Sequence, residues 1–369
     1  MKSDRQIAII QPLIPSYREE FFVMLRQHVN FDLYVYHPKE FLLANGFSAS
    51  SIPIKRLNSI SIGKLMLFGI TPLFKKEYSV YVLCAERKLA CNWIYLLMAK
   101  LLNKKTILWG HGLNANFYDT YMHKMPIIYK VMYRLADAAW FYTENERRLW
   151  STLLPSLKSV ALGNTVSIPT TNKIYTDEEK ASLRTRYGIK TAVNFIFCAR
   201  FSNANRRVDL LVEIINRLNP DIFGFIIIGG GPLKPDFSHY SNVYDHGPVY
   251  DDEMKSDLFA IADAYLQPGW TGLSIVEAMA YGKSILTFER SADISQCVEY
   301  GYIEHTRNGM VFQNINQLIS FITEATRQDY RQMGENARLY YQANLSMSNM
   351  VGNALKSLVM LHDEIKIRV

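Results

Sequence analysis

Short apolar runs typical of buried strands alternate with amphipathic helical runs along this chain, and the alternation occurs twice. In the first half, the strand-like runs lie at residues 6–14, 31–37, 79–85, 105–112, 137–143 and 158–164. Helical periodicity fills intervals such as 18–29 and 92–103. Strands that alternate with helices in this way predict a parallel sheet with helices on both faces.

A polar stretch at residues 166–188 interrupts the pattern, and the alternation then restarts with strand-like runs at 192–201, 223–232, 242–249, 264–269 and 284–288. We therefore predict an α/β chain of two Rossmann-like, doubly wound domains facing a central cleft, the expected ligand site. The expected parts are an N-terminal domain (1–165), a linker (166–190), a C-terminal domain (191–345) and a C-terminal helix (346–369) that could pack back on the first domain.

Composition excludes several classes of protein. The chain has 369 residues, 49% of them hydrophobic, which is enough for two full cores and argues against disorder. No apolar stretch reaches the roughly 18 residues that span a bilayer, and the opening MKSDRQ is unlike a secretion signal, so we expect a cytoplasmic protein. The four cysteines form no C-x-x-C pair and no zinc spacing.

Positive charge is concentrated in the first half of the chain. Residues 1–165 hold 21 Lys and Arg against 11 Asp and Glu, whereas residues 166–369 hold 20 against 23, an imbalance that favours a phosphate-bearing partner. Because no nucleic-acid-binding motif occurs, an anionic membrane is the better candidate. In residues 62–78, large apolar side chains lie between Lys64, Lys75 and Lys76, as in interfacial segments. A buried helix with solvated ends is the alternative explanation.

Two common nucleotide-binding motifs are absent from the sequence. The turn after the first strand, QPLIPSYREE, has no glycine. IIIGGGPLKPD has Pro232 and Pro235 where the dinucleotide fingerprint needs a glycine and a helix start. No P-loop occurs either. The sequence therefore does not support a dinucleotide oxidoreductase or a P-loop enzyme.

The segment QPGWTGLSIVEAMAYGK, residues 267–283, places a glycine-rich turn between a strand and a helix. Glycine lets the backbone approach a ligand closely, and the unpaired N–H groups of a helix start bind anions, so we expect a diphosphate on Gly272, Leu273 and Ser274. Glu277 lies one turn farther along the helix, where its carboxylate could accept hydrogen bonds from a ribose diol. Phosphate and ribose together indicate a nucleotide. A surface salt bridge is the alternative for Glu277.

Together these segments resemble the retaining, two-domain glycosyltransferases of family four, a group that includes bacterial cell-surface polysaccharide and lipopolysaccharide enzymes. The resemblance is carried by PGWTGLSIVEAMAYGK, ARFSNANRRVDLLVEI, IIIGGGPL, LWGHG, ADAAWFYTENER, GNTV and PLIPSYREEFF. It implies the GT-B fold, with the sugar donor held mainly by the C-terminal domain. The implied donor-binding residues are Gly231, Gly269, Trp270, Thr271, Gly272, Leu273, Ser274 and Glu277.

Arginines in ARFSNANRRVDLLVEI form a second part of the predicted site. Arg200 follows a strand and Arg206 precedes a helix, so their guanidinium groups can converge on a diphosphate without a metal. In the family a Gly-Arg and a nearby Lys grip the donor diphosphate; Arg200 matches the first, and Arg206 stands in for the Lys after a loop one residue longer. Arg207 is expected to be a solvated surface residue. No D-x-D triad follows a strand, so we expect no metal and no cofactor.

The chain departs from the family pattern at one position. Family members often carry two glutamates separated by seven residues, the first contacting the sugar and the second the ribose. Eight residues before Glu277, this chain has Gly269 instead. The sugar contacts then fall to backbone amides of GWTGL or to other side chains.

Loops of the N-terminal half carry further candidates. His111 lies between Gly110 and Gly112 after a strand, and the two glycines favour a close approach of the backbone to a ligand. By resemblance, this histidine lies near the donor sugar. The catalytic candidates are therefore His111, Arg200, Arg206 and Glu277. The acceptor-side candidates, which follow other strands, are Tyr17, Arg18 and Glu86.

The resemblance implies a retaining transferase that moves a sugar from a nucleotide-sugar donor to a lipid-linked saccharide or polysaccharide in bacterial surface glycan synthesis. UDP-sugar is favoured over GDP-sugar. The enzyme would contact the inner face of the cell membrane peripherally, through anionic lipid, and would not bind nucleic acid. The alternatives are an inactive nucleotide-sugar sensor or scaffold, which the missing glutamate suggests, and an epimerase or sugar phosphorylase on the same architecture.

Overall fold

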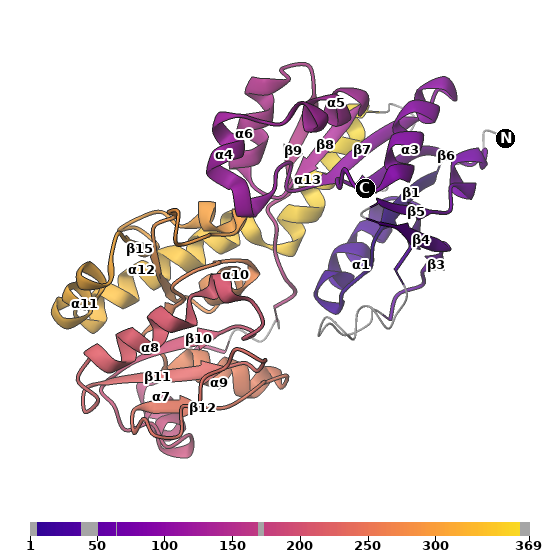
Figure 1. Ribbon diagram of the computed structural model, residues 1–369. Coiled ribbons are helices and arrows are strands. Elements are labelled where there is room, and N and C mark those ends of the chain that lie inside the picture. Colours follow the sequence, from indigo (N-terminus) through magenta and orange to yellow (C-terminus); the bar gives the residue numbers. More distant parts are fainter. Residues whose placement is uncertain (1–5, 38–50, 64, 169–172, 362–369) are drawn as a thin grey trace. The chain divides into compact units, whose positions relative to one another are not determined.

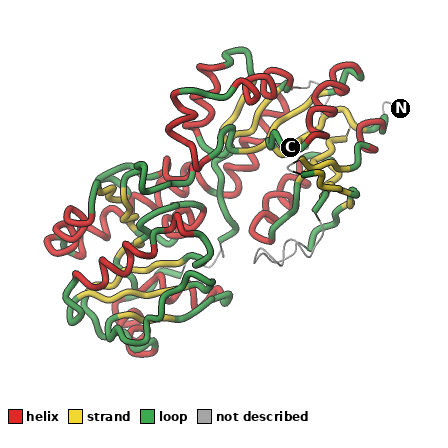
Figure 2. The backbone as a smooth tube through the Cα atoms, in the orientation of Figure 1, coloured by secondary structure: helices red, strands yellow, loops and turns green. Residues whose placement is uncertain are grey.

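The structure is a computed structural model that describes residues 6–37, 51–63, 65–168 and 173–361. The chain divides into two compact units, Met1–Ser167 with Ser346–Val369 and Ile168–Leu345. Each unit contains one parallel sheet with helices on both faces, so the predicted α/β class with two Rossmann-like sheets is confirmed (Figures 1 and 2).

The first unit contains a seven-stranded sheet in the order β3-β2-β1-β6-β7-β8-β9. Its strands are β1 (Gln6–Gln11), β2 (Phe31–Val35), β3 (Lys55–Arg56), β6 (Tyr78–Cys84), β7 (Lys105–Gly110), β8 (Ala138–Phe141) and β9 (Lys158–Ala161). Its helices are α1 (Glu19–His28), α3 (Ala90–Leu101), α4 (Tyr118–His123), α5 (Ile127–Leu135), α6 (Glu144–Leu153) and α13 (Met347–Leu361). The order reverses between β1 and β6, which places the loops after these two strands at a switch point.

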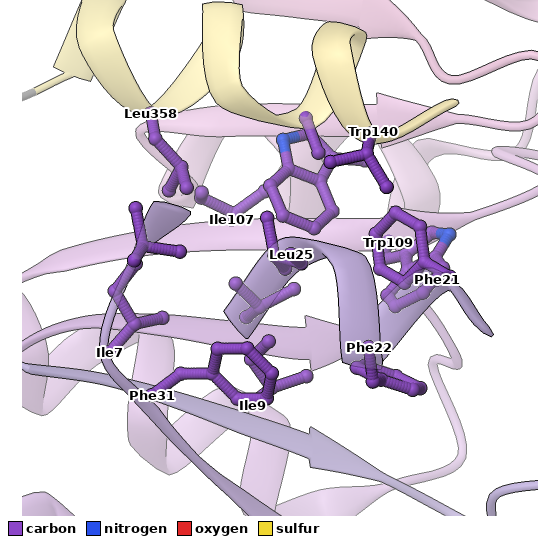
Figure 3. Close-up of a cluster of buried hydrophobic side chains, with 14 of the residues drawn as sticks. Ile7, Ile9, Phe21, Phe22, Leu25, Phe31, Ile107, Trp109, Trp140 and Leu358 are labelled. Atoms are coloured by element: carbon purple, nitrogen blue, oxygen red, sulfur yellow. The ribbon is translucent and has the colours of Figure 1, made fainter. Parts of the chain in front are cut away.

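One face of this sheet carries a core in which residues from both ends of the chain meet (Figure 3). Leu25 of α1 and Leu358 of α13 enter the same buried cluster as Ile107 and Trp140 of the sheet. Complete burial of such side chains contributes about 1.5–3 kcal/mol each. The expected return of the C-terminal helix to the first domain is therefore seen for residues 347–361, where α13 packs on α1, β8 and β9.

The second unit contains a six-stranded parallel sheet in the order β12-β11-β10-β13-β14-β15. Its strands are β10 (Val193–Cys198), β11 (Phe223–Ile228), β12 (Val243–Asp245), β13 (Ala264–Leu266), β14 (Ser284–Phe288) and β15 (Gly309–Phe312). Its helices are α7 (Asp177–Arg186), α8 (Val208–Arg217), α9 (Asp252–Ile261), α10 (Leu273–Ala280), α11 (Ile315–Glu324) and α12 (Arg327–Tyr340). Alternate residues of β10 face opposite cores: Phe195 packs in one cluster and Ile196 in the other.

Two segments differ from what the sequence predicts. The expected linker contains α7, which has a capping box between Thr176 and Glu179 and packs on α9 of the second unit. The proposed interfacial segment 62–78 is not a helix. Outside Lys64, which lies beyond the described residues, it forms the end of a hairpin of β4 (Ser59–Ile62) and β5 (Leu65–Phe68), a 3₁₀ turn η2 (Thr71–Phe74), and the start of β6. Gly69 and Pro72 break the apolar run into these short pieces.

Candidate active site

The predicted donor-binding residues of the second unit gather where its strand order reverses. β10 lies between β11 and β13, and ligands of doubly wound sheets bind beyond the carboxyl ends of strands at such a point. The loop after β10 carries Arg200 and the 3₁₀ turn η4 (Ala204–Arg206). The loop after β13 carries residues 267–272, which lead into α10.

Gln267 fixes the backbone of this second loop from inside. Its side-chain amide donates to the carbonyl oxygens of Gly269 (2.9 Å) and Trp270 (2.7 Å). Its Oε1 atom accepts from the hydroxyls of Ser274 (2.8 Å) and Tyr265 (2.6 Å). Gln267 is fully buried, so this network holds the glycine-rich turn in one conformation.

A second buried glutamine limits which groups of the turn can meet a ligand. Gln296 Oε1 accepts from both the backbone N–H (2.9 Å) and the hydroxyl (3.0 Å) of Thr271. The N–H of Trp270 donates to the Ser295 carbonyl (2.9 Å). The amides of Trp270 and Thr271 are thus committed to the protein. The structure therefore does not support these two amides as donor contacts, whereas contacts from the side chains of Trp270 and Thr271 stay a prediction.

The start of α10 offers backbone donors next to this turn. Gly272 is the N-cap of α10, and the backbone N–H of Ile275 donates to the Gly272 carbonyl oxygen. Within the described part of the chain, no partner is recorded for the amides of Gly272, Leu273 and Ser274. Such N–H groups, together with the positive end of the helix dipole, favour an anion at this position.

Arg206 forms no ion pair with any residue that the structure describes. Its Nε and Nη1 atoms are buried and have no hydrogen-bond partner among the described residues. Burial lowers the pKa of this guanidinium, and the charge of nearby Arg200 lowers it further. A buried, unpaired charge beside a like charge is costly to fold, and an anion bound between the two arginines would relieve both costs. Arg207, expected to be solvated, instead forms an ion pair with Asp209 (2.6 Å).

The missing first glutamate has a steric explanation. A Cβ atom at Gly269 would lie 2.4 Å from the carbonyl oxygen of Asn205 and 3.1 Å from the side chain of Arg207. The loop that carries Arg206, which is one residue longer than in the family pattern, therefore occupies the space that a side chain at position 269 would need.

Glu277 has a partner that the sequence did not indicate. Lys255 of α9 lies 3.1 Å from Glu277 Oε1, and each side chain is only about one-fifth exposed (20% and 17%). Burial alone would lower the pKa of Lys255, but the Glu277 carboxylate raises it above its usual value. Glu277 thus forms a salt bridge, as the alternative expected, but the pair is largely buried and not at the surface. Periodicity could have identified Lys255, because buried Leu258 and Phe259 follow it by one helical turn.

Gly231 has a packing role that the sequence did not indicate, and its predicted contact with the donor stays a prediction. Its φ of +143° suits glycine, and a Cβ there would lie 2.5 Å from the Phe201 carbonyl oxygen. The loop after β11 thus packs directly on the loop that carries Arg200. The glycine at 231 is needed for this approach between two loops.

Arg18 is an internal residue of the first unit. It is 7% exposed and donates to Asn164 Oδ1 (2.7 Å), to the Thr165 carbonyl (3.4 Å) and to Met350 Sδ (3.1 Å). These bonds tie the start of α1 to the loop after β9 and to α13. The acceptor-side prediction for Arg18 is therefore corrected, because the guanidinium is committed within the fold. Tyr17 stays beside it, with the Arg18 guanidinium 5.4 Å from its ring.

The glycines around His111 have packing reasons. A Cβ at Gly112, where φ is +71°, would lie 2.6 Å from both Phe141 and Trp150, and one at Gly110 would lie 2.9 Å from Ala85. These packing contacts account for the two glycines without a ligand, and the predicted approach of a ligand to the backbone stays a prediction. His111 itself follows β7 and packs edge-on against Tyr142, with ring centroids 4.5 Å apart.

Glu86 is the exposed acceptor-side candidate. It follows β6 at the switch point of the first sheet, and its Oε1 accepts from the Lys88 amide (3.1 Å). Across the described residues, no three His, Cys, Asp or Glu side chains are grouped to hold a metal ion. No helix in the described ranges has the length and apolar character needed to cross a membrane.

A family model described as "Glycosyl transferases group 1" matches residues 192–327, which include both loops of the site. This match and the fold together support a glycosyltransferase. A search of curated proteins by sequence finds no significant match.

Solved structures share the whole fold at low sequence identity. HepE of Anabaena in complex with UDP-glucose has a TM-score of 0.64 and 14% identity, covering 96% of this chain and 100% of its own. Sucrose-phosphate synthase of Thermosynechococcus elongatus has a TM-score of 0.65 and 14% identity, and the match covers 97% of this chain and 100% of that one. The lipopolysaccharide outer core galactosyltransferase WaaB has a TM-score of 0.62 and 14% identity, and the match covers 96% of this chain and 99% of that one. The chain therefore has the two-domain architecture of GT-B glycosyltransferases.

Proposed function

We propose that this protein is a retaining glycosyltransferase that uses a UDP-sugar, or less favourably a GDP-sugar, and no metal ion. The observation that carries the proposal is Arg206, whose buried Nε and Nη1 atoms have no hydrogen-bond partner among the described residues. Arg200 and the first amides of α10 lie on the same edge of the sheet. Together they form a site for a dianionic group such as a diphosphate.

The chemistry of this site suits the departure of a nucleoside diphosphate. When the bond between the sugar and the diphosphate breaks, negative charge grows on the leaving oxygen. Arg206, whose Nε and Nη1 atoms are buried, and the N-terminus of α10 would meet that charge with little reorganisation, and the exposed Arg200 beside them would add a second cation. Each such donor is typically worth a factor of about 100–1,000 in rate. Retention follows when the acceptor hydroxyl attacks from the face that the diphosphate leaves.

Glu277 and the N-terminal loops have supporting roles in the proposal. Lys255 takes Glu277 Oε1, which leaves Oε2 to accept from a ribose hydroxyl. The nucleotide preference rests on HepE, which was solved with UDP-glucose. His111 and Tyr17 follow strands of the first sheet and are the proposed contacts for the sugar and the acceptor.

The acceptor that we propose is a hydroxyl of a lipid-linked saccharide or polysaccharide made at the inner face of a bacterial cell membrane. The excess of positive charge in residues 1–165 supports a phosphate-bearing acceptor and an anionic surface. WaaB, which shares the fold, is described as acting on the lipopolysaccharide outer core.

Calorimetric titration with UDP, followed by incubation of radiolabelled UDP-glucose with bacterial membrane lipid, tests the proposal. We expect UDP to bind, Arg206→Met to weaken binding strongly, and label to enter the lipid with its anomeric configuration retained. Arg217→Met is the matched control, because Arg217 pairs with Glu213 on the far end of α8. Absence of UDP and GDP binding by the wild-type protein would refute the proposal.

An inactive nucleotide-sugar sensor is the second candidate, and Gly269 favours it because the backbone of Asn205 excludes a side chain there. It predicts donor binding without transfer or hydrolysis in the same assay. An epimerase would instead convert the free donor to its epimer, and a phosphorylase would release sugar only with phosphate. Each outcome is distinct from incorporation of label into lipid.

A further inference from the structure

The outer surface of α3 and α5 in the first unit is apolar where a soluble helix is usually polar. The inner side of α3 is buried, with Tyr95 packed against Tyr81 of β6, so its other side faces solvent. That solvent side repeats large apolar residues with helical spacing at Ile94, Leu97 and Leu101. Leu101 is 78% exposed, the highest value among the large apolar residues that the structure describes in the first unit.

The neighbouring helix continues this surface. α5 packs beside α3, and its inner side is buried through Tyr133, which contacts Phe141 of β8. Ile127, at 77% exposure, begins its outward side. The 3₁₀ turn η2 also contacts α3 and adds Phe74, whose side chain is 58% exposed. We call this surface the α3–α5 face; its exposed apolar residues are Phe74, Ile94, Leu97, Leu101, Ile127, Ile128 and Val131.

The second unit has no comparable surface among its described residues. Its exposed large apolar side chains are Ile174, Ile222, Leu233, Tyr250 and Leu339, and each lies on a different element or loop. Single exposed apolar residues are normal, whereas a contiguous apolar surface rimmed by polar residues marks an interaction site. Within the described residues, the α3–α5 face is therefore a candidate interaction surface, larger than the exposed apolar residues Ile60, Ile62 and Leu65 of the β4–β5 hairpin.

Charge identifies the partner. Residues 87–134, which include both helices, hold eight Lys and Arg and a single acidic residue, Asp119. Lys100 and Arg134 are exposed on the two helices, and the guanidinium of Arg87 lies 5.7 Å from the ring of Tyr129 on α5. Two copies of this face would bring like charges together, which opposes self-association. Apolar side chains ringed by cations match the headgroup boundary of an anionic bilayer.

We propose that the α3–α5 face docks the protein on an anionic lipid bilayer, with Leu101 and Ile127 inserted at the headgroup boundary and Lys100 and Arg134 at lipid phosphates. The assignment rests on the peripheral membrane contact proposed above but places it on different residues from the segment 62–78 that the sequence suggested. Two parts of that segment contact α3, namely β5 and the turn η2, and η2 contributes the exposed Phe74.

Vesicle sedimentation of the full-length chain tests this surface. Vesicles of phosphatidylcholine alone are compared with vesicles containing about one quarter phosphatidylglycerol, whose negative charge attracts basic residues. We expect the wild-type chain to sediment with the anionic vesicles and to be released by 0.5 M salt, roughly the range in which screening removes such attraction. Leu101→Glu combined with Ile127→Glu should weaken the apparent affinity at least about tenfold, since it removes two insertions and adds two repelling charges.

Two further variants keep the result interpretable. Leu339→Glu, at a site 61% exposed on α12 of the second unit, is the matched control and should bind as the wild type does. Lys100→Gln combined with Arg134→Gln should reduce binding to anionic vesicles while leaving the fold intact. Both replaced positions are exposed, so the melting temperatures of all variants should remain close to that of the wild type.

Three results would overturn the proposal. The glutamate pair could bind anionic vesicles like the wild type, the wild type could ignore phosphatidylglycerol, or sedimentation could reveal a wild-type dimer that the glutamate pair dissociates. UDP titration of the same variants separates this question from the reaction. If the glutamate pair binds UDP as the wild type does but no longer binds anionic vesicles, the result supports the α3–α5 face as the membrane-docking surface. If the wild type does not bind UDP, only the proposed transferase function is refuted.

Discussion

Arg18 and Arg206 occupy equivalent places in the two units, and their surroundings differ completely. Each arginine ends a 3₁₀ turn that follows the first strand of its sheet and precedes a helix, η1 (Ser16–Arg18) after β1 and η4 after β10. Arg18 donates to three groups within its unit. Arg206 has two buried nitrogens without a partner in the described residues. The same position in the fold therefore serves structure in one unit and, we infer, ligand binding in the other.

The two arginines differ because the neighbouring elements of each unit supply different hydrogen-bond acceptors at its switch point. In the first unit, α13 and the loop after β9 supply Met350 and Asn164, which fill the space around the guanidinium. In the second unit, the strand beside β10 is followed by a turn whose own polar groups are satisfied by Gln267 and Gln296. Neither Nε nor Nη1 of Arg206 has an acceptor within the described ranges. An arginine whose N–H groups all have acceptors in the protein stabilises the fold. An arginine whose buried N–H groups lack acceptors gains hydrogen bonds when an anion binds, and so favours binding.

Arg206→Met should have the largest effect on activity. We expect the rate of donor turnover, measured as kcat/KM, to fall about 100–1,000-fold, because one preorganised donor to the diphosphate is lost. The melting temperature should stay the same or rise, because a buried charge without a partner is removed. Enzyme assays and calorimetric melting on the same preparations measure both. A variant that loses stability and keeps full turnover would contradict the comparison.

Arg18→Met should show the reverse pattern. The substitution removes the buried hydrogen bonds of Arg18 to Asn164 and Thr165, so we expect the free energy of unfolding to fall by about 2–3 kcal/mol. UDP affinity should not change, because the proposed donor site lies in the second unit. Urea denaturation and UDP titration measure the two quantities. Equal losses of UDP affinity in the Arg18 and Arg206 variants would show that the two arginines are not functionally distinct.

Two glycines allow the same comparison in the backbone. Gly269→Ala places a Cβ 2.4 Å from the Asn205 carbonyl, and Gly112→Ala places one 2.6 Å from Phe141 and Trp150. Overpacking of this kind typically costs about 1–3 kcal/mol, so both variants should melt earlier. Only Gly269→Ala should also weaken UDP binding, because it displaces the loop that carries Arg206. Melting curves with and without UDP separate the two effects.

A glutamate introduced at position 269 sharpens this test. If the loop from 203 to 207 is what excludes the family's first glutamate, Gly269→Glu alone should lose donor turnover. Removal of one residue from the loop in the same chain should restore part of it. Turnover that rises in the single variant would mean that the space at 269 is open to a side chain.

The sequence predicted most of the fold, because strand and helix periodicities depend on local residue patterns. The strands of the two sheets from β1 to β14 lie within the predicted runs, with two exceptions. Strand β6 begins one residue before its run, at Tyr78, and the two-residue strand β3 was not predicted. β15 and the β4–β5 hairpin were missed, since four-residue strands such as GMVF carry little periodic signal. The class of ligand at the second switch point also followed from glycines and arginines near strand ends.

The sequence could not show which polar groups the fold itself consumes. Arg18 and Arg206 look alike in one dimension, and only long-range contacts to residues such as Met350 distinguish them. Gly112 and Gly269 likewise both resembled ligand-binding glycines, although aromatic side chains explain the first and a neighbouring loop the second. Hydrogen bonds between residues distant in the chain decide such roles, and a single sequence does not record them.

The Lys255–Glu277 pair provides the smallest expected effect and the finest test of the second switch point. Because Glu277 raises the pKa of Lys255, the pair should be intact throughout the neutral range, and its contribution to stability should be lost only as pH rises through that raised value. We expect Glu277→Gln to weaken UDP binding about tenfold and Lys255→Met a few-fold, since the lysine acts by holding the carboxylate.

The double variant distinguishes positioning from direct contact. If Lys255 acts only through Glu277, the combined loss should be close to that of Glu277→Gln alone, with a coupling free energy of about 1 kcal/mol in a UDP-binding cycle. Additive losses would place the ammonium on the nucleotide itself. The positive charge of the site would then come from α9 as well as from the loop after β10. The second switch point would have three cations for a ligand, Arg200, Arg206 and Lys255, whereas Arg18 at the first is used within the fold.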